Sequence, residues 1–208
     1  MERASIPRLH VTTDDRILGS SDFFAAASSV CAAGSGRIAF HVRGPHTSGR
    51  TVYRLVRDLT PVARSSGTLL VVNDRIDVAL AEGVEAVHLG DRSLDVRQAR
   101  DLLGDSVLIG RSVHAVEEAD ELEGDADYLF FGNVHATESH PGMEEQGERR
   151  LTLAAARATP VLGIGGVTVE RVPSLLSAGA YGVAVLGGVW DAPDPSAAVK
   201  QYISALGG

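Results

Sequence analysis

The chain has 208 residues, of which 44% are hydrophobic and 22% are charged, and its formal net charge is −8. These are the values of an ordinary folded domain, which excludes extensive disorder, and the acidic balance argues against nucleic-acid binding, which needs a basic surface. No apolar leader and no run of eighteen apolar residues occur, so we expect neither a signal peptide nor contact with a membrane. The single cysteine, Cys31, has no partner for an internal disulfide, which favours a cytoplasmic protein.

Short apolar, strand-like runs alternate along the chain with stretches of helical apolar spacing. In chain order, the predicted strands are residues 8–12, 37–42, 68–72, 86–89, 107–110, 128–131, 160–164 and 182–186. The predicted helices between and after them are residues 22–33, 50–63, 75–81, 95–103, 115–123, 149–158, 169–177 and 195–206. The pattern is therefore eight βα repeats.

Eight βα repeats predict a closed TIM (β/α)8 barrel, an α/β fold, and we expect a single domain over residues 1–208. The competing α/β architecture is a doubly wound open sheet, which usually has a glycine-rich turn after its first strand. Here the first strand ends in Thr12-Thr13-Asp14-Asp15, which has no glycine. No linker rich in proline, glycine or serine divides the chain, so a second domain is not expected.

Polar side chains gather where the predicted strands end, which is where a barrel of this kind places its active site. Five of the seven histidines lie there or in the loop after the sixth strand: His41, His88, His114, His135 and His140. A single histidine at a strand end can serve only to complete local hydrogen bonds. Five of them favour an enzyme.

Two glycine-rich runs follow the last two predicted strands, Gly163-Ile164-Gly165-Gly166 and Val185-Leu186-Gly187-Gly188. Bare backbone amides in such loops can converge on an anion, and TIM barrels bind phosphate after strands seven and eight. The predicted phosphate ligands are the amides of four residues, Gly165, Gly166, Leu186 and Gly187. The alternative, that these glycines only let the chain turn tightly, stays open.

Several segments taken in order resemble the thiamin phosphate synthase/TenI superfamily. They are Leu9-His10-Val11-Thr12-Thr13-Asp14, Asn73-Asp74-Arg75-Ile76-Asp77, Val87-His88-Leu89-Gly90, Gly110-Arg111-Ser112-Val113-His114, Ala126-Asp127-Tyr128 with Phe131-Gly132-Asn133-Val134, and Gly163-Ile164-Gly165-Gly166-Val167. The resemblance covers nearly the whole chain and implies a compact TIM barrel. Its synthase members join a thiazole phosphate to a pyrimidine pyrophosphate with magnesium, and its TenI-like members are associated with an aromatising proton shift in a thiazole carboxylate phosphate.

The chain departs from the synthase pattern at three charged positions. Arg43 is kept, but Pro45 stands where the resemblance implies a lysine, Ser93 where it implies a metal-binding acid, and His140 where it implies a second lysine. Departure of pyrophosphate needs cations or metal to absorb its charge, so these losses argue against the synthase reaction.

Whether a bound metal ion is expected depends on which branch of the superfamily the chain follows. We expect no cofactor and no metal for a proton shift. Magnesium on Asp74 is expected only under the synthase alternative, where Asp91 could replace the lost acid.

The stretch Gly110-Arg111-Ser112-Val113-His114-Ala115 is most similar to TenI, and that resemblance implies that His114 is the general acid/base. Imidazole titrates near neutral pH and can both take and give a proton, although a helix-capping role for His114 stays open. The other predicted substrate-binding residues are His41, Arg43, Asn73, Asn133, His135 and His140, with His41 or Arg43 near the substrate carboxylate. The partner is a small phosphorylated thiazole.

Three functions follow as hypotheses: a TenI-like thiazole tautomerase first, an active thiamin phosphate synthase second, and a noncatalytic phosphate-ligand binding barrel third. The first is an isomerase and the second a transferase. The sequence is compatible with a homo-oligomer as well as with a monomer.

Overall fold

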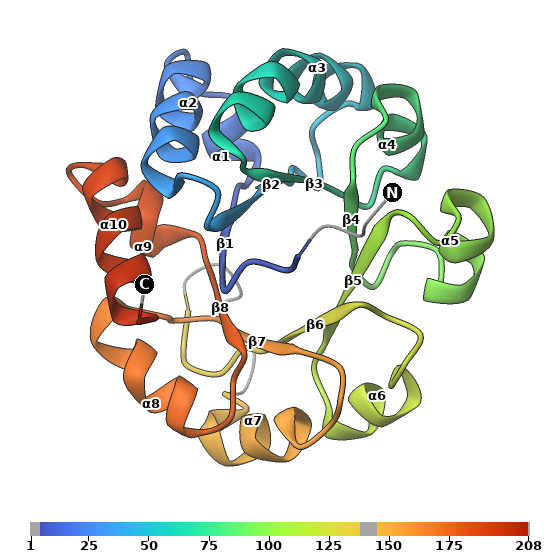
Figure 1. The fold of residues 1–208 in the computed structure, drawn as a ribbon, viewed down its shortest axis with the longest axis vertical. Helices are drawn as coiled ribbons and strands as arrows, with labels where there is room; N and C mark the ends of the chain where they lie inside the picture. The colour runs from blue at the N-terminus through green and yellow to red at the C-terminus, as the bar shows by residue number, and fades with distance from the viewer. Residues whose placement is uncertain (1–4, 138–144, 208) are drawn as a thin grey trace.

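The computed structural model describes residues 5–137 and 145–207, and its strands close into one parallel barrel (Figure 1). The strand order follows the chain order, and β1 pairs with β8 to close the ring. The strands are β1 Leu9–Thr12, β2 Ile38–Val42, β3 Leu69–Asn73, β4 Ala86–Leu89, β5 Leu108–Val113, β6 Tyr128–Phe131, β7 Val161–Ile164 and β8 Gly182–Val185. The predicted TIM barrel and all eight predicted strands are confirmed, and β5 runs three residues further than expected.

Helices surround the barrel on the outside (Figure 1). They are α1 Asp15–Leu18, α2 Phe23–Gly34, α3 Gly49–Ser66, α4 Ile76–Glu82, α5 Val96–Leu103, α6 Val116–Glu121, α7 Gly147–Ala155, η1 Val169–Arg171, α8 Val172–Ser177, α9 Gly187–Trp190 and α10 Pro195–Ala205. The sequence did not predict α1 and α9, which are only four residues long. Asp14, which the sequence placed at the barrel mouth, also caps α1 by accepting a hydrogen bond from the Ile17 amide at 2.8 Å.

Successive side chains along each strand point alternately toward the helices and toward the barrel interior. This divides the core into an outer and an inner layer. In β3, Leu70 and Val72 belong to the apolar layer between strands and helices, whereas Leu69 and Val71 fill the barrel interior. The helices complete the outer layer with apolar residues at helical spacing, as in the buried face of α3, which consists of Val52, Val56, Leu59 and Ala63. No helix in the described part of the chain is long and apolar enough to cross a membrane.

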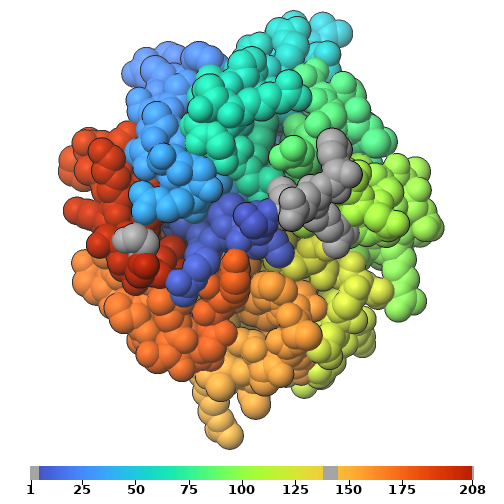
Figure 2. Space-filling view, viewed as in Figure 1, coloured from blue at the N-terminus to red at the C-terminus, as the bar shows by residue number. Residues whose placement is uncertain are grey.

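The segment before β1 closes one end of the barrel. Ile6 packs against the apolar side chains of the barrel interior. Its carbonyl accepts a hydrogen bond from the Tyr181 hydroxyl at 2.7 Å. Figure 2 shows this segment, in dark blue, lying across the centre of that face. A ligand therefore has access at the opposite end of the barrel, where the carboxyl ends of the strands lie.

The barrel interior is aromatic and rich in histidine. His10, His41 and His88 are at most 1% exposed, and their rings pack against one another and against Tyr128 and Phe130. A side chain at position 110 would overlap the Tyr128 ring, so Gly110 is required for this packing. Burial lowers the pKa of His41 to about 3 and holds the pKa values of His10 and His88 well below 6.5.

The buried histidines should make the free energy of unfolding depend on pH. Between the unfolded pKa of 6.5 and the lowered folded values, the unfolded chain binds more protons, so stability is lost as pH falls below about 6.5. Each histidine contributes up to about 1.4 kcal/mol per pH unit. Urea unfolding at pH 7.5, 6.0 and 5.0 measures the slope. The variant His88→Gln should make the free energy of unfolding depend on pH about a third less steeply. An unchanged pH dependence in this variant would contradict a neutral, buried His88 ring.

Candidate active site

A cavity of about 890 Å³ opens at the carboxyl ends of the strands. Its lining includes a residue that ends or follows each of the eight strands: Thr12, Arg43, Asn73, Asp91, His114, Asn133, Gly165 and Gly187. An opening of this size accommodates a small phosphorylated ligand. The structure therefore brings Arg43, Asn73, Asn133, His114 and the predicted phosphate loops to one cavity.

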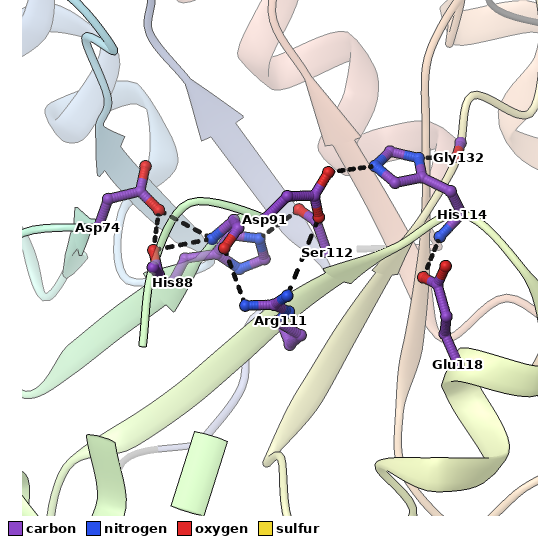
Figure 3. A network of polar contacts seen from close by, with 10 residues as sticks. Asp74, His88, Asp91, Arg111, Ser112, His114, Glu118 and Gly132 are labelled. Atoms are coloured by element: carbon purple, nitrogen blue, oxygen red, sulfur yellow. Dashed lines mark hydrogen bonds and ion pairs between the residues drawn. The ribbon is translucent and has the colours of Figure 1, made fainter. Parts of the chain in front are cut away.

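His114 follows β5 directly, and three contacts fix its position (Figure 3). Its backbone amide donates to a Glu118 carboxylate oxygen on α6 at 2.8 Å, and its ring Nδ1 lies 2.6 Å from the Gly132 carbonyl oxygen. A carbonyl only accepts, so Nδ1 carries the hydrogen and the neutral ring has its lone pair on Nε2. Nε2 lies 3.7 Å from Asp91 Oδ2. These contacts hold the His114 ring in the lining of the cavity.

Asp91 lies between the His114 ring and the Arg111 guanidinium (Figure 3). Arg111 Nη2 is 3.9 Å from Asp91 Oδ1, and Arg111 Nη1 donates to the Gly90 carbonyl at 2.8 Å. The Asp91 side chain is 68% exposed. Its carboxylate is placed to stabilise a protonated His114 ring by charge attraction, which an exposed pair supplies only weakly until a ligand displaces water.

Two predicted substrate-binding histidines do not line the cavity. His41 is fully buried one level below it, with its two ring nitrogens within 2.9 Å of His10 and Asn73. His135 Nε2 is buried without a hydrogen-bond partner, 3.8 Å from a Glu148 carboxylate oxygen. Neither side chain is part of the cavity lining. His140 lies outside the described residues.

The structure adds three cationic residues that the sequence did not single out, Arg92 and two arginines that make polar contacts at the cavity. Arg16 and Arg171 line the cavity from α1 and η1, the first paired with Asp191 at 2.8 Å and the second donating to the Gly166 carbonyl at 2.6 Å. Their position shortly after the first and seventh strands is the signal that could have identified them. They matter because the chain's only lysine is Lys200.

The predicted phosphate cradle lies at the cavity, since Gly165, Gly166, Leu186 and Gly187 all line it. Gly187 is the first residue of α9, so its amide hydrogen has no partner within that helix. Gly165 and Gly166 have φ values of 94° and 59°, and a Cβ on Gly165 would lie 2.7 Å from Asn133 Cβ. Both glycines are therefore needed for packing as well, and a substitution of Gly165 would disturb the loop as well as ligand binding.

Gly187 offers a cleaner probe of the cradle, because the nearest heavy atom to an added Cβ would be the end of the Asp191 side chain, at 2.8 Å. Gly187→Val should weaken binding of a phosphate ligand by about tenfold, or roughly 1.4 kcal/mol, and leave the melting temperature within a few degrees of the original. Calorimetric titration with inorganic phosphate and thermal unfolding measure the two effects. Unchanged phosphate affinity would remove Gly187 from the cradle.

The carboxylates at the cavity do not fit a two-carboxylate magnesium site. Asp74 Oδ1 already accepts hydrogen bonds from the Gly90 amide, at 2.8 Å, and from the Ser93 hydroxyl, and Asp91 faces Arg111 and His114 (Figure 3). Magnesium takes carboxylate oxygens, and here a hydroxyl occupies the place of the second one. Within residues 5–137 and 145–207, no group of three or more His, Cys, Asp or Glu side chains is suited to a metal ion.

The fold and the site define a class of protein, a (β/α)8 barrel whose cavity is lined by two glycine-rich loops and by His114. The family model described as thiamine monophosphate synthase matches residues 9–189. The chain belongs to this family, whose name is TMP-TENI, and so to a family of thiamin-biosynthesis enzymes. The superfamily resemblance found in the sequence is confirmed.

Individual relatives carry the synthase name. A thiamine-phosphate synthase of Salinispora arenicola is 37% identical over 98% of this chain and 99% of its own, and one of Haloarcula marismortui is 40% identical over 79% and 81%. Among solved structures, a thiamine phosphate pyrophosphorylase from Pyrococcus furiosus matches with a TM-score of 0.81 and 29% identity over 96% of this chain and 95% of its own. These names favour the transferase alternative over the isomerase that the sequence analysis put first.

Proposed function

We propose that the protein is a thiazole tautomerase that catalyses an aromatising proton shift in a thiazole carboxylate phosphate. The observation that carries the proposal is the position of His114, which lines the cavity with its Nδ1 2.6 Å from the Gly132 carbonyl oxygen and its Nε2 3.7 Å from Asp91 Oδ2. A tautomerase needs one group that accepts a proton from carbon and returns a proton to another carbon. A neutral imidazole beside a carboxylate meets that need.

The reaction can be written with the residues of this chain. The glycine cradle holds the phosphate, and Arg43, which is half-buried at the cavity, pairs with the substrate carboxylate. His114 Nε2 takes a proton from a ring carbon, and the electron pair of that bond moves into the ring system. Asp91 stabilises the imidazolium, which then gives a proton to the second carbon. The proton count balances, and the ring becomes aromatic.

The proposed step requires neither a metal nor a redox cofactor. A proton shift transfers no electrons to an acceptor and breaks no phosphorus–oxygen bond, so no pyrophosphate charge has to be absorbed. This agrees with the replacement of a lysine by Pro45 and of a carboxylate by Ser93 beside the same cavity.

The second candidate is a thiamin phosphate synthase, a transferase, and the names of the relatives favour it. That reaction would use Arg43 and the cradle to hold phosphate groups and Asp74 with Asp91 to hold magnesium. Ser93 bonded to Asp74, and Asp91 turned to Arg111, weigh against it.

Deuterium incorporation tests the proposal. We expect the enzyme, incubated in D2O with the synthetic tautomer of the thiazole carboxylate phosphate, to yield an aromatic product that carries deuterium on the carbon that receives the proton, because the hydrogen on His114 Nε2 exchanges with solvent before it is delivered. Proton NMR of the product measures this. Aromatisation no faster than in buffer alone would contradict the proposal, and binding without turnover would indicate the noncatalytic barrel.

A further inference from the structure

A chain of hydrogen bonds runs through the barrel interior from its closed end to the cavity. His10 Nε2 lies 3.0 Å from the Pro7 carbonyl oxygen, His10 Nδ1 lies 2.8 Å from His41 Nε2, and His41 Nδ1 lies 2.9 Å from the side-chain amide of Asn73. His10 and His41 are fully buried, and Asn73 is 7% exposed and lines the cavity. The chain therefore links the floor of the barrel to a cavity residue.

The donors and acceptors of this chain can point in only one direction. The Pro7 carbonyl accepts only, so His10 Nε2 carries the hydrogen. Burial keeps both rings neutral, lowering the pKa of His41 to about 3 and that of His10 well below its usual range. His10 Nδ1 is then an acceptor, His41 Nε2 must donate to it, and His41 Nδ1 is left with a lone pair.

The last bond of the chain decides how the Asn73 amide is turned. Asn73 Oδ1 stands 2.9 Å from His41 Nδ1, where two lone pairs would face each other. The oxygen and nitrogen ends of an amide are nearly equal in size, and half a turn about the Cβ–Cγ bond exchanges them. With Nδ2 toward His41, every bond of the chain has one donor and one acceptor.

We propose that the His10–His41 pair fixes Asn73 with its Nδ2 toward His41 and its Oδ1 toward the cavity, which makes Asn73 a specificity-determining residue. An oxygen at that point accepts hydrogen bonds and repels anionic oxygens. It therefore selects a ligand with a ring N–H, amino or hydroxyl group on the β3 side of the cavity. Phosphate is directed away from β3, toward the glycines that follow β7 and β8.

The neighbour of Asn73 strengthens this polarity. Asp74 also lines the cavity and carries a carboxylate, so the end of β3 offers acceptors only. The orientation of Asn73 follows from the hydrogen bonds alone and holds whichever reaction the site performs. The exclusion of phosphate from the β3 side rests on the proposed tautomerase, because magnesium on Asp74 would bring pyrophosphate to the same strand.

Histidine tautomers in the free protein test the proposal directly. Long-range proton–nitrogen correlation spectra of protein with 15N-labelled histidine distinguish the two neutral forms. We expect His10 and His41 both to carry hydrogen on Nε2, and a side-chain NH2 proton of Asn73 to be protected from exchange by its bond to His41. A His41 ring with hydrogen on Nδ1, or a doubly protonated ring, would overturn the proposal.

A pair of aromatic variants separates the chain from general packing. His10→Phe keeps a ring against Tyr128 and Phe130, whose centroids lie 4.9 and 5.2 Å away, but removes the acceptor for His41. His41 should then move its hydrogen to Nδ1, and the Asn73 NH2 should lose its protection. The control Tyr128→Phe removes only a hydroxyl bonded to His88 and should leave both signals unchanged. If His10→Phe does not fold, the wild-type tautomers alone decide.

A titration with inorganic phosphate tests the selectivity. Phosphate should shift the backbone amide of Gly187 and leave the NH2 signals of Asn73 in place, because those hydrogens face His41. A phosphate-induced shift of the Asn73 NH2 as large as that of Gly187 would show that Asn73 donates to anions, contrary to the proposal.

Discussion

Replacing His114 by alanine should lower turnover of the thiazole tautomer phosphate by about a hundredfold or more, because the variant lacks the group that moves the proton. KM and the melting temperature should change little, since the ring makes one hydrogen bond, to the Gly132 carbonyl, and is about one-third exposed. Steady-state kinetics and thermal unfolding measure these quantities. A loss of turnover with unchanged stability identifies an acid–base group rather than a packing residue.

The matched control is His135→Ala, which removes a histidine outside the cavity lining. Its effect on turnover should be within a few-fold. If His114→Ala keeps full activity, the assignment of His114 fails, and His140, which lies outside the described residues, becomes the next candidate.

The second large effect concerns the synthase reaction. We expect the protein to turn over a pyrimidine pyrophosphate and a thiazole phosphate far more slowly than once per second, even with magnesium, because uncharged residues stand where the family resemblance implies a lysine and a metal-binding acid to absorb the charge of pyrophosphate. Pro45 and Ser93 are the described positions that lack charge. Pyrophosphate release measures this, and magnesium-dependent release at about one per second or faster would establish the transferase instead.

A variant at Asp74 distinguishes the two reactions in one protein. Asp74→Asn keeps the shape of the side chain and an oxygen that can accept from the Gly90 amide and the Ser93 hydroxyl. Tautomerase turnover should remain within a few-fold of the original. A loss of a hundredfold or more in magnesium-dependent activity would show that Asp74 carries a metal.

The sequence predicted the fold because the barrel is built from a repeated local pattern. Each apolar run of four to six residues became a strand, and each amphipathic stretch, such as α3 with Val52, Val56 and Leu59 on one face, became a covering helix. The short helices α1 and α9 were missed because four residues hold no periodic signal. They depend on local features, such as the Asp14 cap of α1.

The sequence was less informative about depth within the barrel. His41 and Asn73 both point inward and lie near the ends of β2 and β3, yet Asn73 reaches the cavity and His41 lies beneath it. The stagger of neighbouring strands sets this difference, and the stagger is a property of the closed sheet rather than of either strand. The packing of Gly165 against Asn133 is likewise a contact between two loops that no local pattern reveals.

The most direct test of the central claim is the initial rate at which the protein aromatises the thiazole tautomer phosphate, measured with magnesium and again with a chelator. We predict the same rate in both, faster than the uncatalysed reaction by orders of magnitude, because His114 and Asp91 supply the chemistry without a metal. No aromatisation in either condition, together with rapid magnesium-dependent pyrophosphate release from the synthase substrates, would contradict the account.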